Sequence, residues 1–529
     1  MTTEASEGPA IPKAVATPQA AARYPKSIPS IIGNEACERF SFYGMRNILT
    51  DFLIGYLLLD LVEKERAGAA KEVFHVFVMG VYFFPLLGGW ISDRFLGKYR
   101  TIFWLSLLYC VGHGCLALFE ANKTGFYAGL FLIALGSGGI KPCVSSFVGD
   151  QFDQTNKHLA RVVFEAFYWV INFGSFFASQ LMPRALKHWG PSIAFGIPGI
   201  LMFVATLIFW MGRKEYVVVP PSPADPHSFG NIALTALKKG RGAEFALAGL
   251  GVLGFVGSLF LIPKLGFVAS FCLAIVIFLV FAGLGVMLSL DAARGVHPDE
   301  DVEGVRSVLK VLVVFALVTP FWSLFDQKAS TWIIQGKAMV LPGWSILETA
   351  SQMQAINPLL VMLLIPFNNA VSYPLLRKIG LDPTPLRRMT AGIAIAGVSW
   401  IVIGVIQRWI DAGEQVSILW QLLPYTLLTF GEVLVSTTGL EFAYSQAPAK
   451  MKGTLMSFWS LSVTVGGLWV LIVNAGMKNE GLTSAITART GLSTTAFQMF
   501  FFAGFAFVFA LAFGAYATRY KSVEHYRKA

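Results

Sequence analysis

The chain has 529 residues, of which 55% are hydrophobic and 14% charged, and its mean hydropathy is +0.62. This composition excludes an ordinary soluble enzyme. The formal net charge of +10 indicates anchoring to an anionic lipid surface rather than binding to nucleic acid.

The apolar residues gather into segments of about 20 residues, the length that crosses about 30 Å of hydrocarbon. An even number of spans puts both chain ends on one side of the membrane. The loops on that side carry more Lys and Arg than the others, so we expect both termini to be cytoplasmic. Fourteen spans are expected, near residues 31–60, 71–93, 99–120, 125–147, 161–183, 192–211, 243–262, 265–290, 305–328, 354–376, 388–408, 417–440, 453–475 and 495–518.

The chain ends and the cysteines add a few expectations. Residues 1–27, rich in Ala, Pro and Thr, are expected to form a disordered cytoplasmic tail, and residues 520–529 a second tail. No apolar core with a cleavage site precedes the first span, so no removable signal peptide is expected. The five cysteines lie in apolar spans without metal-ligand spacing, so neither a disulfide nor a metal cofactor is expected.

Residues 35–46, at the start of the first span, include two carboxylates and two guanidinium groups, on Glu35, Glu38, Arg39 and Arg46. On a helix the first three share one face, and Arg46 returns to it about two turns later. Each such group costs roughly 2.5–3.5 kcal/mol at membrane depth and normally faces water or another charge. This span is therefore predicted to line a polar path.

A polar stretch at residues 212–242 divides the chain, and two nearly uncharged spans follow it. Short basic turns at residues 88–98 and 377–388 form a weak repeat between the two halves. Parallel six-helix repeats characterise major-facilitator transporters, and the first turn resembles the loop motif of that superfamily. We therefore expect an all-α integral membrane protein with a six-helix bundle at 28–211, a linker and inserted two-helix hairpin at 212–304, and a second six-helix bundle at 305–519.

Four motifs follow one another along the chain: Glu35-x-x-Glu38-Arg39-Phe40-x-Phe42-Tyr43-Gly44, Gly88-Gly89-x-x-x-Asp93-x-x-x-Gly97-x-x-x-Thr101-Ile102, Phe164-x-x-Phe167-Tyr168-x-x-Ile171-Asn172-x-Gly174-Ser175, and Gly431-Glu432 to Pro448. The first is similar to ExxERFxYYG, and together they resemble the signatures of proton-dependent oligopeptide transporters. Extra hairpins such as 243–290 are typical of bacterial members. Phe42 departs from the pattern, because many members have Tyr there and its hydroxyl could contact substrate.

The resemblance implies a transporter and not an enzyme. Members take up di- and tripeptides by proton-coupled symport and alternating access, here across the bacterial cytoplasmic (inner) membrane. The implied partners are peptides, protons as the coupling ion, and the lipid bilayer. A monomer without a cofactor is expected.

A carrier of varied peptides must hold the terminal ammonium and carboxylate and tolerate what lies between them. The first half supplies Arg39, Arg46 and Lys141, and the second half supplies Glu432. By resemblance, Lys141 contacts the peptide carboxylate, and Glu432 meets the ammonium together with Asn172 and Asn357. The residues alone leave open that Lys141 snorkels to the interface and that Glu432 makes a purely structural bond.

The resemblance also implies gates and side-chain pockets. Arg46 and Asp326 would close the outside, and Lys141 and Glu432 the inside, although Asp326 could also be an exposed helix-end residue. The aromatic residues Tyr43, Tyr82, Trp322 and Trp459 match positions that line side-chain pockets. Core packing is the alternative for each of these rings.

Proton coupling is expected at Glu35 and Glu38, as Arg39 alternates between them and the peptide carboxylate. Glu432 would couple similarly to Lys141. His75 matches a histidine proposed for coupling in the family, and a solvated histidine near the surface is the alternative. His113 and Glu165 carry no implied role.

Two other classes remain at this stage. A carrier of nitrate or another small solute is opposed by Glu432, which suits an ammonium and repels nitrate. A nutrient receptor or membrane-embedded enzyme has no support from a metal cluster, nucleophile elbow or phosphate loop.

Overall fold

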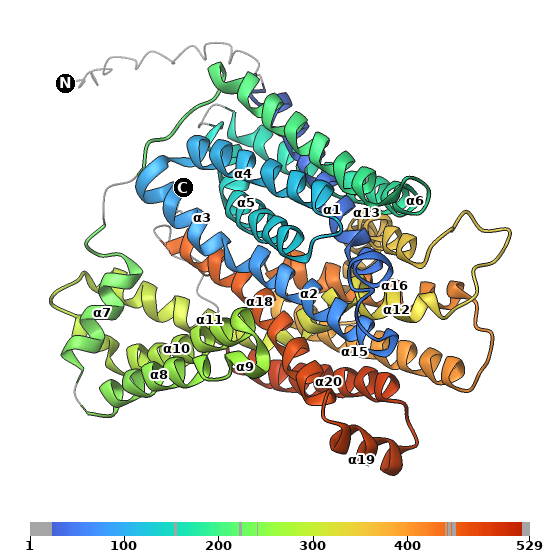
Figure 1. Ribbon diagram of the computed structural model, residues 1–529. Helices are drawn as coiled ribbons and strands as arrows, with labels where there is room; N and C mark the ends of the chain where they lie inside the picture. The colour runs from blue at the N-terminus through green and yellow to red at the C-terminus, as the bar shows by residue number, and fades with distance from the viewer. Residues whose placement is uncertain are drawn as a thin grey trace, which may run out of the picture.

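The structure is a computed structural model that describes residues 24–152, 156–221, 225–240, 242–439, 442, 446 and 451–520. Helices dominate these residues, and their only extended pairings are two isolated bridges (Figure 1). Most of the two expected tails lies outside the described residues, as does most of the last motif after Gly439. The side chain of Glu165 also lies outside them.

The first bundle is built on two extensive helix contacts, α1 against α6 and α4 against α5. Gly190 has a non-helical backbone (φ +81°) and kinks α6 into two successive helices, which account for the fifth and sixth expected spans. The helices are α1 (Ile28–Phe52), α2 (Glu63–Phe83), α3 (Pro85–Ile91), α4 (Lys98–Leu118), α5 (Lys123–Asp150) and α6 (Lys157–Met211), with π-helices η1 (Leu53–Leu57) and η2 (Ser92–Leu96) and the 3-10 helix η3 (Gly212–Lys214).

The inserted segment (green in Figure 1) lies beside the second bundle. Its two long helices pack on each other, and α10 also packs against α7 and α18. The elements are α7 (Phe229–Lys239), α8 (Ala243–Leu259), α9 (Ile262–Leu265), α10 (Phe267–Ser289) and the 3-10 helix η4 (Leu290–Ala293).

The second bundle contains the remaining elements, with α15 packed on α20 and α11 on α18. Its α-helices are α11 (Asp299–Asp326), α12 (Thr331–Lys337), α13 (Ile356–Phe367), α14 (Tyr373–Lys378), α15 (Pro385–Asp411), α16 (Leu422–Glu432), α18 (Lys452–Met477), α19 (Glu480–Thr490) and α20 (Thr494–Arg519). Shorter turns are η5 (Gln327–Ala329), η6 (Ala350–Ala355), η7 (Asn368–Ser372), η8 (Ile418–Gln421) and η9 (Val433–Thr437).

Within the described residues, eleven helices are long and apolar enough to cross a membrane, or twelve if the bent pair α7–α8 is one span. The difference from fourteen has three causes. One of the eleven, Ala166–Lys214, contains two expected spans. The hairpin helix α8 has only 17 residues, and α1 is made too polar by its charged residues. Each expected span still coincides with a helix.

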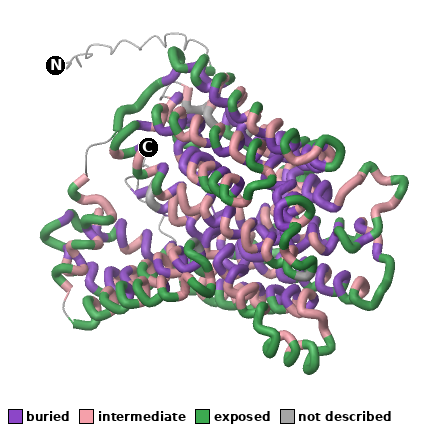
Figure 2. The backbone as a smooth tube through the Cα atoms, viewed as in Figure 1, coloured by how far each residue is buried: buried purple, intermediate pink, exposed green. Residues whose placement is uncertain are grey.

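The interior is divided between two large hydrophobic cores: one holds residues of the first bundle together with Ala329, and the other holds residues of the second bundle, α7, α10 and η4. Apolar side chains are exposed on the outer surface, whereas buried residues concentrate inside (Figure 2). This arrangement suits a lipid surround. We call the membrane side on which α1 begins the terminal side, and the side on which α1 ends the far side.

Candidate functional site

Three charged side chains form a cluster on α1. The Arg39 guanidinium lies 2.9 Å from a Glu35 carboxylate oxygen (Nε to Oε1) and also pairs with Glu38. All three residues are buried, as their spacing along one helix face predicts. One cation between two carboxylates leaves an excess negative charge, which a proton can neutralise.

Close packing on α6 sets the orientation of α1. A Cβ atom at Gly44 would lie only 2.9 Å from Cγ of Met182, so glycine permits this approach. At 3.6 residues per turn, Glu35 and Arg46 point away from Gly44. The charged face of α1 is therefore directed away from α6.

Lys141 follows a backbone contact between α3 and α5. A Cβ atom at Gly88 would overlap the backbone of Gly139, so the two helices touch directly just before Lys141. The Lys141 ammonium lies 4.1 Å from the centroid of the Tyr82 ring and 4.8 Å from that of Phe42. Both distances allow cation–π attraction. Phe42 thus supports the cation through its ring face, without the hydroxyl that many family members carry.

Arg46 and Asp326 join the two bundles. Arg46 Nη2 donates to Asp326 Oδ1 over 2.7 Å, and both residues are buried. The guanidinium carbon of Arg46 also lies 5.4 Å from the centroid of the Phe74 ring. The expected partners of the outer gate are therefore in contact, and Asp326 is not an exposed helix-end residue.

Glu432 ends α16, just before the π-helix η9. A Cβ atom at Gly431 would lie 2.7 Å from the Gly392 carbonyl oxygen on α15, so glycine brings the two helices together. Asn357 donates from Nδ2 to Glu432 Oε2. Lys328 Nζ donates to Asn357 Oδ1 over 2.7 Å. Asn357 therefore bridges a cation and a carboxylate.

Lys328, rather than Lys141, is the lysine nearest to this carboxylate network. Within the described part of the chain no ion pair joins Lys141 to Glu432, and both side chains are partly exposed. Lys328 is buried and interacts electrostatically with Glu432. Sequence analysis gave Lys328 no role. In the sequence, Lys328 is distinguished only as a basic residue at the end of an expected span, two positions after Asp326.

His75 lies at the interface between the bundles. Its Nε2 is 3.1 Å from Ser330 Oγ, and the residue is completely buried. The alternative of a solvated histidine near the membrane surface is therefore wrong. His113 lies inside the first bundle, with Nε2 2.9 Å from Ser41 Oγ.

The residues expected to line the substrate pocket differ in their contacts. Trp322 and Trp459 face each other edge to face, with centroids 5.7 Å apart, and the buried indole nitrogen of Trp322 has no described hydrogen-bond partner. Tyr43 interacts electrostatically with Glu432. Asn172 instead donates to the backbone carbonyl of Tyr168 on its own helix, over 3.0 Å.

The expected polarity between the halves is only partly present. Both bundles bury charges of both signs: the first contributes Glu35, Glu38, Arg39 and Arg46, and the second contributes Asp326 and Lys328. Among the described residues no group of three or more His, Cys, Asp or Glu side chains could hold a metal ion.

Two helical bundles that meet at buried charges of both signs define a multi-pass membrane transporter of the major-facilitator type, which confirms the predicted fold class. The chain belongs to the POT family, whose profile matches residues 99–487. This confirms the resemblance read from the motifs.

Two solved structures are very similar to this chain. A crystal structure of an auto-inhibited POT family peptide transporter has a TM-score of 0.92 and 62% identity, covering 96% of this chain and 99% of that one. An in meso crystal structure of the POT family transporter PepTSo has a TM-score of 0.91 and 62% identity, covering 94% of this chain and 98% of that one.

Curated animal proteins are more distant and longer. Solute carrier family 15 member 2 of Mus musculus is 33% identical over 422 residues, which are 77% of this chain and 52% of that protein. The chain thus spans about half the length of the curated relatives that it matches.

Proposed function

We propose that the protein takes up di- and tripeptides together with protons by alternating access. One observation carries the proposal: the buried cation Arg46 of the first bundle interacts electrostatically with Glu432, which a network in the second bundle holds. Relatives with this fold are named peptide transporters. Such a site suits a ligand with a charge at each end.

Each end of the peptide has a candidate partner. Arg39, Arg46 and Lys141 would receive the carboxylate, while Glu432 and Asn357 would receive the ammonium, with Asn172 close by. Because Lys328 holds Asn357 and Glu432 in place without substrate, the ammonium would replace Lys328 there. The rings of Tyr43, Tyr82, Trp322 and Trp459 would surround the side chains, and the free indole N–H of Trp322 suits a peptide carbonyl.

Proton coupling would begin at the cluster on α1. A peptide carboxylate competes with Glu35 and Glu38 for Arg39, and the carboxylate that loses Arg39 becomes a proton acceptor. Glu432 would couple in the same way to Lys141, its expected partner. His75 would respond to opening and closing of the gate, because its contact with Ser330 links the two bundles.

We infer an inward-facing state from the contacts of the proposed gate residues. Arg46–Asp326 is formed, whereas Lys141 and Glu432 contact other groups. We take the terminal side as cytoplasmic and the membrane as the bacterial inner membrane. The bundles at 28–211 and 305–519 would rock as a monomer, with 212–304 as linker and hairpin.

Counterflow and driven uptake in proteoliposomes test the proposal. Labelled dialanine should accumulate when the inside is negative and the outside acidic, by roughly fifty-fold per 100 mV for one net charge. Unlabelled di- and trialanine should compete, whereas nitrate should not. Accumulation that a protonophore leaves unchanged, or competition by nitrate alone, would overturn the proposal.

A further inference from the structure

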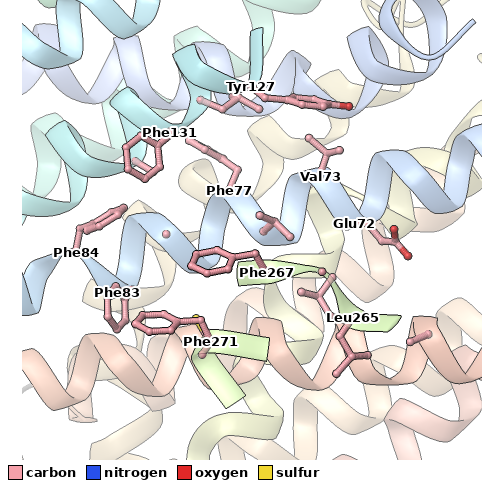
Figure 3. Close-up of a pocket in the computed structure, with 18 of the residues that line it drawn as sticks. Glu72, Val73, Phe77, Phe83, Phe84, Tyr127, Phe131, Leu265, Phe267 and Phe271 are labelled. Carbon is pink, nitrogen blue, oxygen red and sulfur yellow. The ribbon is translucent and has the colours of Figure 1, made fainter. Parts of the chain in front are cut away.

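A cavity of about 590 Å³ lies away from the central charges, between the first bundle and the inserted hairpin. Helices α2 and α5 of the first bundle form one side, and α10 with the end of α18 forms the other (Figure 3). The hairpin contributes Leu265, Phe267 and Phe271 to this wall. This volume lies within the range of small-molecule sites, about 300–1,000 Å³.

The cavity has an apolar end and a charged end. Phe83, Phe84 and Phe131 lie together at one end in Figure 3, and the ring centroids of Phe84 and Phe131 are 5.8 Å apart. Glu72 lies at the opposite end, toward which the hydroxyl of Tyr127 also points. The far-side parts of these helices therefore carry the polar rim, and the deeper parts carry the aromatic floor.

The length of the cavity matches one leaflet of a bilayer. Glu72 and Phe83 are eleven residues apart on α2, which corresponds to about 17 Å of helix. Half of a hydrocarbon core is about 15 Å thick. A cavity that begins at the interface and ends near the membrane centre has the span of one acyl chain.

The cavity opens toward lipid rather than toward water. Phe131, which belongs to the apolar end, lines it and is 57% exposed. Exposed aromatic side chains at this depth face hydrocarbon, because water there would leave its hydrogen bonds unmade. A peptide would meet no polar partner below the rim.

Two ammonium groups stand at the rim, on Lys264 and Lys478. Lys478 pairs with Glu72, whereas Lys264 is exposed and has no ion pair within the described part of the chain. The three charges leave one net positive charge where the head group of a far-leaflet lipid would lie. A phosphate diester complements that charge.

We propose that this cavity binds a phospholipid of the far leaflet, with one acyl chain between α2 and α10 and its phosphate at Lys264. The hairpin thus forms one wall of a lipid site. The bound lipid contacts the first bundle, the hairpin and α18 together.

Photo-crosslinking of the full chain in maltoside micelles tests the site, with phosphatidylglycerol that carries a diazirine on one acyl chain. Cross-links should be saturable and should map to α2 and α10. Val73→Trp fills the cavity and should abolish them, whereas Val111→Trp, on the exposed face of α4, should not. Lys264→Glu should lower the yield by about fivefold or more, whereas Arg489→Glu on exposed α19 should leave it unchanged.

The matching diacylglycerol, which has the same chains and no phosphate, separates the two parts of the proposal. It should label the site weakly and be insensitive to Lys264→Glu. Monodisperse elution and unchanged helical circular dichroism identify variants that fold. Labelling spread over all lipid-facing helices, equal labelling in folded Val73→Trp, or equal labelling by diacylglycerol would overturn the proposal.

Discussion

The two ends of the interface between the bundles differ in their contacts. On the far side, ion pairs and hydrogen bonds cross from one bundle to the other. On the terminal side, Lys141 rests on aromatic rings of its own bundle and Glu432 is held by Asn357 of its own. The far-side contacts include Arg46–Asp326, Thr50–Ala329, Asp51–Lys337, Asn47–Gln354, Gln180–Gln352, Arg184–Glu348, His75–Ser330 and Glu72–Lys478.

Polar contacts on only one side allow the two bundles to separate and rejoin. The far side is joined by polar bonds, and each contributes about 0.5–3 kcal/mol, so their sum can be reversed by a ligand and a proton. A continuous apolar contact of the same extent would be harder to separate. The transition between the two states therefore depends on which charges are paired.

Removing one partner of the buried far-side ion pair should have the largest effect. Asp326→Ala leaves Arg46 buried without its carboxylate, at a cost of about 3–5 kcal/mol, so driven uptake should fall by a hundredfold or more. Electron–electron distance measurements between spin labels at the far-side ends of the bundles should show loss of the closed population. Lys337→Gln, which removes a more exposed pair with Asp51, is the control. Near-normal uptake by Asp326→Ala would contradict the role of the pair as a gate.

Glu432→Gln should have the next largest effect, because the site loses its charge for the peptide ammonium. A hydrogen bond to a charged group contributes about 1.5–3 kcal/mol, so dialanine affinity should fall by roughly tenfold or more. N-acetyl dialanine, which has no ammonium, should bind the variant and the parent equally. Calorimetric titration of both ligands measures this difference, and an equal loss for both would refute the assignment.

Most of the scaffold and the charged motif of α1 could be predicted from the sequence. The spans follow from local hydropathy, and Glu35 and Arg39 share a face through helix geometry alone. The contact of Lys328 with Asn357 and Glu432 could not, because it joins three separate segments of the second bundle and depends on side-chain reach. The bond between His75 and Ser330 could not be predicted either, because it joins residues of different bundles and also depends on side-chain reach.

Lys328→Ala should change the contacts of Glu432 at the terminal side. Without Lys328, Glu432 should turn to Lys141, which favours closure of that side. We expect a shift of about five- to tenfold in the ratio of the two states, as for a change of roughly 1 kcal/mol. Spin-label distances across the terminal side measure it. Lys310→Ala, at an exposed position of α11, is the matched control, and identical distributions in the two variants would rule out this competition.

Glu348→Gln should have the smallest effect on the closed population, and that effect should depend on pH. Hydrogen bonds from His188 and Arg184 lower the pKa of Glu348 from its ordinary value. The contact therefore favours far-side closure above the ordinary glutamate pKa and loses that effect as the pH falls through the lowered pKa. For an exposed pair, the change in closed population should be about twofold at neutral pH and absent in acid. A difference that grew in acid would contradict this sign.

The polarity of α1 has a consequence for how the chain enters the membrane. Its charged side chains are paired with neighbours in the finished protein, but Asp326 emerges from the ribosome long after Arg46. At roughly 2.5–3.5 kcal/mol per charge, α1 alone is a poor substrate for lateral release from the translocon. We expect chains that stop before α6, the helix on which α1 packs, to leave α1 extractable by alkaline carbonate, whereas longer chains retain it. The charged residues of α1 thus postpone its stable insertion until α6, its helical neighbour, has been made.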